Sequence, residues 1–485
     1  MKNRFILSVL LVGLMTGISS CKDDKDDIEN PTATESQKWV EKTMRKHYYW
    51  NDEIPQASKL NYTKDTKDFF YSLLSKNDGK DYSDNSGHYY YSTIKELSAA
   101  SRSNINEENS YGFEYTGIYA AGSNSQFIYA VILYVLKDSP ADVAGLKRGD
   151  WIMQMNDHDI SQADFNSLAS GNGVSFTISR WNATRNMLVK MDDKITLSAS
   201  HAIEEDPVLV AKTLYSPVKG QRIGYLVYTR FEDGKTEGDT SYDDELRNLS
   251  KTTFNGVEEF VLDLRYNNGG LLSSALLLCS ILEPNSALDQ SLGYLKYNDG
   301  KKESLYNGRS ALKGGGSNLN LKTLYVLVSN NTASASEMVI NSLKPYMNVI
   351  LIGEKTEGKN VGSLTYTSDD KAWEMHPIVC QIYNSKDFTD YAHGFKPDIN
   401  NINEAFAYVA TNTVEPVRMY ELGNPNEWML NIAVNMIDGV SANAAMSRAV
   451  TIGNKVTFQK APYNSISRKA TNGVIIDKGF AQTAQ

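Results

Sequence analysis

One segment constrains this chain more than any other: a short apolar run that passes straight into small and hydroxylic residues. Residues 325–337 read Tyr-Val-Leu-Val-Ser-Asn-Asn-Thr-Ala-Ser-Ala-Ser-Glu. The apolar run predicts a buried strand, and the hydroxylic residues predict the start of a helix. Lys359 follows in the glycine-bearing turn Thr-Glu-Gly-Lys at residues 356–359. This arrangement can bring a serine hydroxyl beside a lysine amine, which makes a nucleophile without histidine.

The same residues resemble the S41 family of peptidases, the C-terminal-processing or tail-specific proteases. In that family Ser-Ala-Ser-Glu follows a strand, the catalytic lysine lies in Thr-x-Gly-Lys, and the separation of Ser334 from Lys359 fits the family's spacing. The resemblance implies that Ser334 is the nucleophile of a Ser–Lys dyad and that Lys359 is its general base. An ordinary lysine, with a pKa of about 10.4, is protonated at neutral pH. Burial must therefore lower the pKa of Lys359 by roughly three units.

The hydroxylic residues also have a purely structural interpretation. Thr332, Ser334 and Ser336 are all types that cap helices, and Glu337 can complete a capping box with Ser334. We expect Ser336 to be the cap and Ser334 to be the nucleophile. Lys355 is a second lysine close by, but only Lys359 matches the family motif.

Oxyanion stabilisation needs two backbone donors, and a second segment supplies candidates. Residues 263–270, Asp-Leu-Arg-Tyr-Asn-Asn-Gly-Gly, resemble the family's Asp-Leu-Arg-x-Asn-x-Gly-Gly. The resemblance implies that Gly269 or Gly270 acts together with the N–H of Ala335, the residue after the nucleophile. A glycine turn that feeds a helix is the structural interpretation of the same residues, and it is compatible with the functional one.

One position departs from the family. Many members carry a glutamine four residues after the lysine, where it orients the amine, and this chain has Ser363 there. A serine has a shorter reach. Ser363, Asn360 or a group that the sequence does not identify would then orient Lys359.

The catalytic region is predicted to be an α/β layer. Apolar runs at 222–231, 260–264, 324–328 and 349–353 predict strands, and the segments 271–282 and 336–346 predict helices between them. Strands that alternate with helices are typical of a partly parallel sheet. The family resemblance implies a ClpP/crotonase-like core.

A separate β-rich stretch precedes this core. Residues 139–150, Ser-Pro-Ala-Asp-Val-Ala-Gly-Leu-Lys-Arg-Gly-Asp, resemble a PDZ domain. A PDZ fold exposes a sheet edge to which an extended chain end adds a strand, with its carboxylate held by backbone N–H groups of a loop. Tyr111, Gly112 and Phe113 stand where that loop belongs. A PDZ fold that only packs against the catalytic region is the alternative.

The pattern of the N-terminal residues predicts export from the cytoplasm. Lys2 and Arg4 precede an apolar run at 5–18, and Ser-Ser-Cys follows at residues 19–21. This describes a secretory signal, and the run is shorter than the roughly 20 residues of a membrane span. It resembles a bacterial lipobox, which implies that Cys21 becomes the lipidated N-terminus; an ordinary signal peptide with an incidental cysteine is the alternative. The charged residues 22–27, four aspartates and two lysines, are either a solvated tether or, by resemblance, the acidic Bacteroidetes signal that sends lipoproteins to the cell surface.

The whole chain is therefore expected to be a multidomain α+β protein of the cell envelope, anchored in the outer membrane by lipid. The tail from Gly453 to Gln485 shows no pattern that we interpret. The expected divisions are a signal peptide at 1–20, an acidic tether at 21–35, a helical N-terminal domain at 36–103, a PDZ-like domain at 104–200, a peptidase core at 201–412 and a C-terminal segment at 413–485.

Composition excludes several functions. The 485-residue chain has a net charge of −9, which argues against a nucleic-acid partner. Its six histidines form no His-Glu-x-x-His motif, so we expect neither a metal nor a cofactor. Cys279 lies in an apolar helical stretch and is expected to be buried.

These patterns together predict a serine endopeptidase that acts on extended or unfolded polypeptides, captured by their C-termini through the PDZ-like domain. The main alternative is a catalytically silent, lipid-anchored peptide-binding protein on the same fold. A Ser–Lys amidase for small molecules or cell wall fits the dyad but leaves the PDZ-like domain without a role.

Overall fold

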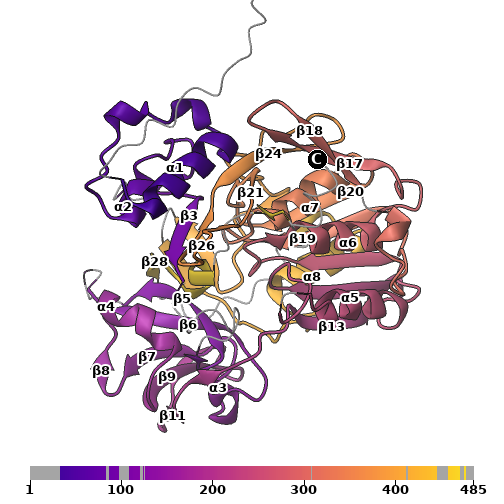
Figure 1. The fold of residues 1–485 in the computed structure, drawn as a ribbon. Helices are drawn as coiled ribbons and strands as arrows, with labels where there is room; N and C mark the ends of the chain where they lie inside the picture. The colour runs from indigo at the N-terminus through magenta and orange to yellow at the C-terminus, as the bar shows by residue number, and fades with distance from the viewer. Residues whose placement is uncertain are drawn as a thin grey trace, which may run out of the picture.

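The computed structural model describes residues 33–82, 87–97, 109–120, 124, 126–236, 238–306, 308–410, 413–444, 457–469 and 474–476. The predicted signal peptide, Cys21 and the charged residues 22–27 lie outside the described residues. Figure 1 shows an N-terminal region, a β-rich region and a large α/β region, so the multidomain, mixed α/β prediction is confirmed. Within the described residues, no helix combines the length and the apolar character that a membrane crossing requires.

The N-terminal region begins with an amphipathic helix and ends in strands. Its elements are α1 (Glu35–His47), α2 (Thr66–Tyr71), β1 (Lys80–Asp81), β2 (His88–Tyr89) and β3 (Thr93–Glu96). Val40, Met44 and Tyr48 of this region are fully buried and pack with Phe69 and Phe70 in one apolar cluster.

The mainly helical prediction for residues 36–103 is wrong for the described residues after Tyr71, where the regular elements are the strands β1, β2 and β3. β3 pairs antiparallel with β23 (Trp373–His376) of the α/β region, with Ile94 opposite Met375. The aromatic and β-branched residues here gain a sheet partner far along the chain, which helical periodicity cannot reveal.

The β-rich region contributes most of a ten-stranded sheet in the order β10-β9-β7-β6-β5-β28-β27-β26, with β8 and β11 beside it. The bounds are β4 (Asn109–Ser110), β5 (Phe113–Tyr119), β6 (Ile128–Val135), α3 (Pro140–Val143), β7 (Trp151–Met155), β8 (His158–Asp159), α4 (Gln162–Phe165), β9 (Val174–Asn182), β10 (Met187–Lys190), β11 (Ile195–Leu197) and β12 (His201–Ala202).

The α/β region is built on a six-stranded sheet in the order β13-β14-β15-β19-β20-β25. All neighbouring pairs from β14 to β25 are parallel, as predicted, and only β13 runs antiparallel. Helices α6 and α7 share one apolar cluster with one face of this sheet, and α8 packs on the other face. The bounds are β13 (Val208–Tyr215), β14 (Arg222–Tyr228), α5 (Ser241–Lys251), β15 (Glu259–Asp263), α6 (Leu272–Leu282), β19 (Thr323–Val328), α7 (Ala335–Leu343), β20 (Asn348–Gly353), β25 (Ile399–Asn400) and α8 (Trp428–Ile437).

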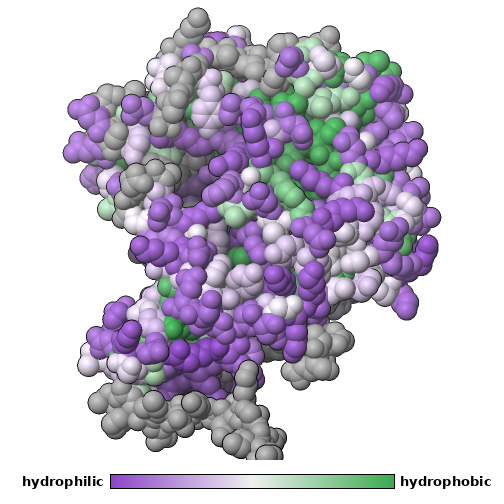
Figure 2. All heavy atoms as spheres, turned by 90° about the horizontal axis from the view of Figure 1, so that it is seen from above, coloured by the Kyte–Doolittle hydropathy of each residue, from purple (hydrophilic) through white to green (hydrophobic). Residues whose placement is uncertain are grey.

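A second six-stranded sheet, in the order β16-β29-β21-β24-β17-β18, completes this region. Cys279 and Cys380 are both buried and free, and the predicted burial of Cys279 is confirmed. Seen from above, the surface is mostly hydrophilic, and apolar residues gather on the side of the α/β region (Figure 2). The remaining bounds are β16 (Gly270–Leu271), β17 (Ser291–Tyr297), β18 (Lys302–Tyr306), β21 (Val361–Ser363), β22 (Tyr366–Thr367), β24 (Ile378–Asn384), β26 (Phe406–Ala410), β27 (Thr413–Pro416), β28 (Phe458–Asn464) and β29 (Val474–Ile475).

The tail that the sequence left without interpretation joins two of these sheets. β28 adds to the ten-stranded sheet between β5 and β27. A short 3-10 helix at Ser465–Lys469 follows, and β29 then enters the second six-stranded sheet. The C-terminal residues therefore contact both the β-rich region and the α/β region.

Candidate active site

Ser334 stands at the sharp turn between β19 and α7. Its backbone has φ 60° and ψ −114°, a left-handed conformation that is strained for a residue with a Cβ. Such strain persists only where the surroundings impose it, and nucleophiles at strand-to-helix turns are a known instance. Thr332 Oγ1 donates to Leu264 O at 2.8 Å, and Ser329 Oγ donates to Arg265 O at 2.6 Å. The turn is thus held against the segment 263–270.

Ser334, and not Ser336, occupies the N-cap position of α7, so the expectation for Ser336 is wrong. The helix begins at Ala335, one residue earlier than expected. Ser336 lies inside the helix and its hydroxyl donates to Asn267 O at 3.1 Å. Among the described residues, the buried Ser334 hydroxyl has no hydrogen-bond partner. A buried polar atom without a partner is costly, which suits a group kept for chemistry.

Gly269 closes on the Ser334 turn. A Cβ at Gly269 would lie 2.7 Å from Ser334 Cβ, 3.0 Å from Ser334 Oγ and 3.1 Å from Ala335 N. Its φ is +113°, which also favours glycine. The structure therefore brings the predicted glycine segment and the Ser334–Ala335 turn into direct contact.

The predicted oxyanion donors differ in their hydrogen bonding in this structure. The N–H of Gly269 donates to Asn267 Oδ1 at 2.8 Å. Gly270 belongs to β16 and pairs with β29. Ala335 is the first residue of α7, where a backbone N–H has no partner within the helix. In this structure the Gly269 donor is engaged inside its own loop.

Glu337 joins the serine turn to the lysine turn. Its Oε2 accepts from the N–H of Ser334 at 3.0 Å and from the N–H of Lys359 at 2.8 Å. Its Oε1 accepts from Gly358 N at 2.7 Å and from Thr356 Oγ1 at 2.6 Å. Burial raises the pKa of this carboxyl to about 7 although all four hydrogen bonds lower it. One buried carboxylate thus places both predicted catalytic residues around itself.

Lys359 is buried, with 6% of its surface exposed, whereas the competing Lys355 is exposed. Burial lowers the pKa of Lys359 to about 8, and the negative charges of Asp78, Glu357 and Glu337 oppose that shift. A lysine with this pKa is partly neutral at pH 7 and can accept a proton. The predicted lowering of the pKa by burial has the expected direction.

The N-terminal region supplies part of the lysine's surroundings. Lys359 Nζ lies over the Tyr91 ring, 4.5 Å from its centroid, a cation–π contact. Tyr91 Oη donates to Glu357 Oε1 at 3.1 Å, and Lys80 Nζ lies 3.5 Å from the same oxygen. The fully buried Asp78 accepts from Tyr91 N at 3.0 Å. Sequence reasoning missed Asp78, Lys80 and Tyr91 because they lie more than two hundred positions before the lysine.

Of the residues proposed to orient the lysine, Asn360 is turned elsewhere. Its Nδ2 donates to Thr389 O at 2.7 Å. Ser363 is fully buried in β21. Tyr91, whose ring lies under the Lys359 amine, is a neighbour of the lysine that the sequence did not identify.

The loop expected to bind a substrate carboxylate is built into the β-rich core. Tyr111 N donates to Ala169 O at 2.7 Å, and Gly112 N donates to Ser110 Oγ at 2.9 Å. Tyr111 and Phe113 are buried in the apolar cluster of this region. The adjoining edge of β5 is also not open, contrary to expectation, because β28 pairs with it from Thr116 to Tyr119. The strand that covers it comes from the uninterpreted tail.

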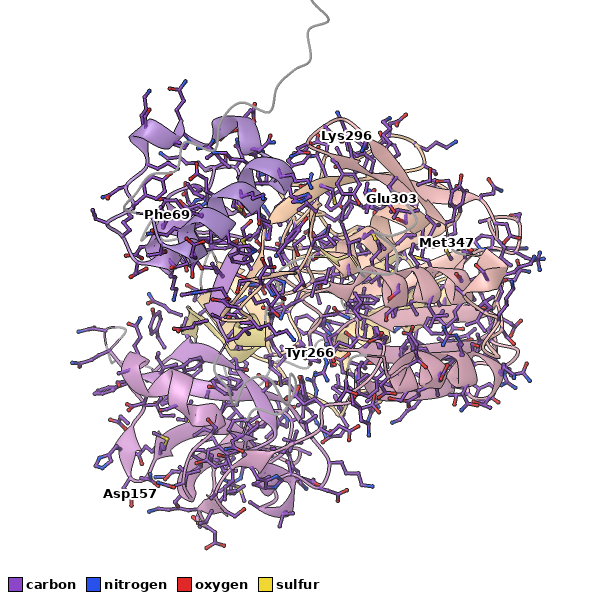
Figure 3. The ribbon with its side chains drawn as sticks, in the orientation of Figure 1. Phe69, Asp157, Tyr266, Lys296, Glu303 and Met347 are labelled. Atoms are coloured by element: carbon purple, nitrogen blue, oxygen red, sulfur yellow. The ribbon has the colours of Figure 1, made fainter. Side chains whose placement is uncertain are left out.

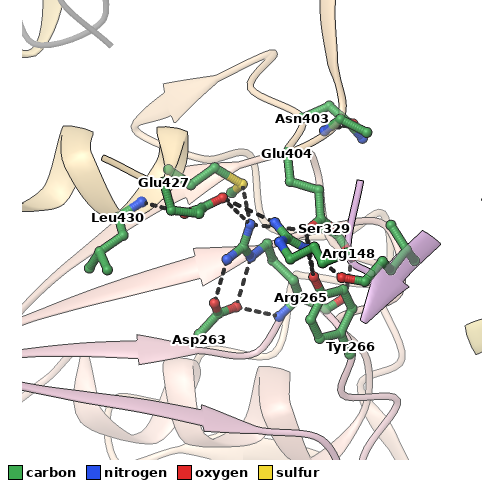
Figure 4. A network of polar contacts seen from close by, with 12 residues as sticks. Arg148, Asp263, Arg265, Tyr266, Ser329, Asn403, Glu404, Glu427 and Leu430 are labelled. Carbon is green, nitrogen blue, oxygen red and sulfur yellow. Dashed lines mark hydrogen bonds and ion pairs between the residues drawn. The ribbon is translucent and has the colours of Figure 1, made fainter. Parts of the chain in front are cut away.

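A buried ionic network supports the segment 263–270 from behind (Figure 4). Arg265 Nη2 lies 2.6 Å from Asp263 Oδ2, and Arg265 Nη1 lies 2.9 Å from Glu427 Oε1. Arg148, from the β-rich region, reaches Glu404 Oε2 at 2.6 Å. These charges stay buried because each has a partner.

Tyr266 lies where the β-rich region meets the α/β region (Figure 3). Its hydroxyl accepts from Arg148 Nη1 at 2.8 Å and donates to Glu404. Arg148 belongs to the segment 139–150, so the network connects that segment to the glycine segment beside Ser334. Among the described residues, no cluster of histidine, cysteine or carboxylate side chains suits a metal ion.

Comparisons with known proteins agree on one family. The model of peptidase family S41 matches residues 222–401, and that of the peptidase S41 N-terminal domain matches residues 35–93. A crystal structure described as an S41 protease of Bacteroides fragilis is 33% identical, with a TM-score of 0.70; the match covers 83% of this chain and 97% of that one.

Two curated relatives are carboxy-terminal processing proteases. The protease CtpA of Bacillus subtilis is 27% identical over 286 residues, 58% of this chain and 54% of the relative. The carboxyl-terminal-processing protease of Synechocystis is 28% identical over 249 residues, 49% of this chain and 51% of the relative. The match spans about half the length of each of these two proteins.

Proposed function

This chain belongs to peptidase family S41, and from that premise we propose that it is a serine endopeptidase in which Ser334 and Lys359 form the catalytic dyad. One observation supports the dyad independently of the family assignment. A single buried carboxylate oxygen of Glu337 accepts from the backbone N–H of both residues, so a strained serine and a buried lysine share one site.

The chemistry follows from these positions. The neutral Lys359 amine accepts the Ser334 proton as Oγ attacks a peptide carbonyl, and the carbonyl oxygen becomes an oxyanion. The N–H of Ala335 stabilises that oxyanion together with Gly270, or with Gly269 once its bond to Asn267 breaks. The Lys359 ammonium then donates its proton to the leaving amine, which gives an acyl-enzyme and a new N-terminus. Water then attacks the ester as Lys359 takes its proton, and Lys359 returns that proton to Ser334 Oγ as the acyl C–O bond breaks, which releases the carboxylic acid product and restores both residues.

The substrate class is proposed to be extended or unfolded polypeptide. Ser334 lies in a buried turn at the start of a helix, so its hydroxyl can attack a peptide carbonyl only where the substrate backbone is accessible. An unfolded chain offers such a backbone. We propose that the region predicted at 104–200 is a PDZ-like domain beside a ClpP/crotonase-like core. Because β28 covers β5, capture of a chain end there requires β28 to move; a packing role for this module is the alternative.

Export and anchoring are a separate proposal. The lipobox-like residues 19–21 support lipidation of Cys21, which would hold the enzyme at the outer membrane. Incorporation of a labelled fatty acid into the chain, and its loss in Cys21→Ser, would support the anchor. Labelling that persists in Cys21→Ser would contradict it.

A catalytically silent peptide-binding protein is the second candidate. The engaged Gly269 N–H and the partnerless Ser334 hydroxyl favour it, since the catalytic hydrogen bonds are not assembled in this structure. Catalytic hydrogen bonds often form only with substrate, however, so the same observations suit a resting enzyme.

Cleavage of an unfolded test protein separates the two candidates. The soluble chain that starts at residue 22 is compared with Ser334→Ala and Lys359→Ala, and each variant is checked for an unchanged thermal unfolding midpoint. The proposal predicts cleavage by the parent and loss of it in both variants. Full cleavage by Ser334→Ala would overturn the assignment, and no cleavage by the parent together with retained peptide binding would favour the silent binder.

A further inference from the structure

A strand from the far end of the chain lies between the two halves of the proposed site. β29 runs parallel to β16 on one side, with Val474 opposite Gly270 and Ile475 opposite Leu271. It runs parallel to β21 on the other side, with Val474 opposite Gly362 and Ile475 opposite Ser363. Without β29, β16 and β21 would be separated by a gap one strand wide.

This gap passes both proposed catalytic turns. On the β16 side, Gly270 follows Gly269, which contacts the Ser334 turn. On the β21 side, the strand begins at Val361, two residues after Lys359. Any backbone that lies in the gap therefore runs between the serine side and the lysine side.

The residue after β29 fills an apolar position. Ile476 is 2% exposed and belongs to the apolar cluster that includes Leu272 and Val379. Its N–H donates to Ser363 O at 3.0 Å. The gap thus accepts an extended backbone through hydrogen bonds on both edges, and it accepts an apolar side chain at the position of Ile476.

The preceding part of the tail is held by side-chain contacts to the rest of the molecule. In β28, Lys460 Nζ lies 2.8 Å from Glu354 Oε1 and donates to Tyr408 Oη at 2.9 Å. Asn268 Nδ2 donates to Ile466 O at 2.8 Å, beside Gly269. β28 and the 3-10 helix therefore act as an anchor that delivers β29 to the gap, whereas β29 itself has two paired residues on each edge.

We infer that the gap between β16 and β21 is the binding site for the substrate backbone, and that residues 474–476 of this chain occupy it as an internal competitor. This inference rests on the proposed peptidase function and deepens it. The ligand class is an extended polypeptide that adds a strand to both edges and carries an apolar residue at the position of Ile476. Substrate enters the gap when β29 leaves, and this step does not depend on movement of β28.

Direct binding tests the site without relying on catalysis. The probe is a fluorescent peptide with the sequence of residues 470–480, and the receptor is a Ser334→Ala chain that ends at residue 472, compared with full-length Ser334→Ala. Fluorescence anisotropy should show saturable binding to the shortened chain and at least about tenfold weaker binding to the full-length chain, whose own tail competes. A peptide with Ile476→Asp should bind at least about tenfold more weakly, because a charge would enter an apolar position.

Equal binding by both chains, or no binding to a folded shortened chain, would overturn the inference. If the shortened chain does not fold, the full-length Ile476→Asp variant replaces it, with exposed Ser467→Asp as the matched control. The internal competitor predicts peptide binding to Ile476→Asp and little binding to Ser467→Asp. Equal binding to these two variants would contradict it.

Activity then separates this inference from the proposed function. In the Ser334 background, shortening to residue 472 should raise kcat/KM at least about tenfold on an unfolded test protein. Binding of the peptide without any Ser334-dependent cleavage would leave the strand site standing and reject the peptidase. Ser334-dependent cleavage that shortening leaves unchanged would reject the internal competitor and keep the peptidase.

Discussion

The serine side and the lysine side of the proposed site are built in different ways. Ser334 is placed by backbone geometry within the α/β region: the end of β19, the start of α7 and the close approach of Gly269. Lys359 is placed by a turn whose surroundings come from elsewhere, with the Tyr91 ring beneath its amine and Asp78 nearby.

The serine side fixes the position of a side chain, whereas the lysine side adjusts the pKa of a side chain. A serine nucleophile needs an exact position, which a strained turn between two regular elements provides. A lysine base needs a lowered pKa, which requires burial by atoms from several parts of the chain. Substitutions on the serine side should therefore abolish activity by displacement, whereas those around the lysine should shift its pH dependence.

The largest expected effect comes from the lysine itself. Lys359→Arg keeps a positive charge but cannot become neutral, so we expect kcat/KM to fall about a thousandfold or more. Lys355→Arg, at the exposed lysine of the same turn, is the matched control and should retain activity. Comparable activity in the two arginine variants would show that Lys359 is not the base.

A methyl group on the serine side should cost nearly as much. Gly269→Ala places a Cβ 2.7 Å from Ser334 Cβ, so the turn must shift, and we expect a loss of about a hundredfold to a thousandfold in kcat. Gly256→Ala has a φ of +69° but no atom within 4 Å of the new Cβ, so it controls for backbone strain alone. An equal loss in the two variants would mean that contact with Ser334 is not responsible.

Glu337 connects the two sides, so its replacement should affect both. Glu337→Gln places an N–H₂ donor where the carboxylate accepts four hydrogen bonds. We therefore expect the free energy of unfolding to fall by about 2–4 kcal/mol. Chemical denaturation measures that change, and kcat should fall at least about tenfold. Unchanged stability would show that the carboxylate does not hold the turns together.

The smallest effect is expected from the N-terminal region. Tyr91→Phe keeps the ring under Lys359 and should change kcat/KM less than about threefold, whereas Tyr91→Leu removes it and should reduce kcat/KM about three- to thirtyfold. The pH profile of each variant is the readout, because a purely structural role would leave its midpoint unchanged. Identical profiles for the two variants would exclude the ring as an orienting group.

The sequence revealed the serine side much better than the lysine side. Strands β15, β19 and β20 and helix α6 match their predicted ranges to within a residue, because each contains an apolar run. For β19, β20 and α6, a glycine or hydroxylic residue also marks a boundary. The glycine segment and the Ser334 turn carry motifs of their own. Signals of this kind lie among neighbouring residues, so a single sequence is enough to show them.

The missed features all depend on contacts between distant parts of the chain. Tyr91 beneath Lys359, β3 beside β23, and β29 between β16 and β21 each join segments far apart in sequence. The tail at 457–476 has little periodicity of its own and becomes strands only by pairing with existing edges. Tertiary pairing of this kind leaves no pattern in a single sequence.

The central claim is that Lys359 activates Ser334, and the pH dependence of Ser334 labelling by a fluorophosphonate tests it most directly. Because burial lowers the pKa of Lys359 to about 8, the neutral amine becomes more abundant as pH rises. The labelling rate should therefore rise with pH, with a midpoint near the lysine's pKa, and should be lost in Lys359→Ala. Rapid labelling in Lys359→Ala, or a rate that does not change with pH in the parent, would contradict the claim.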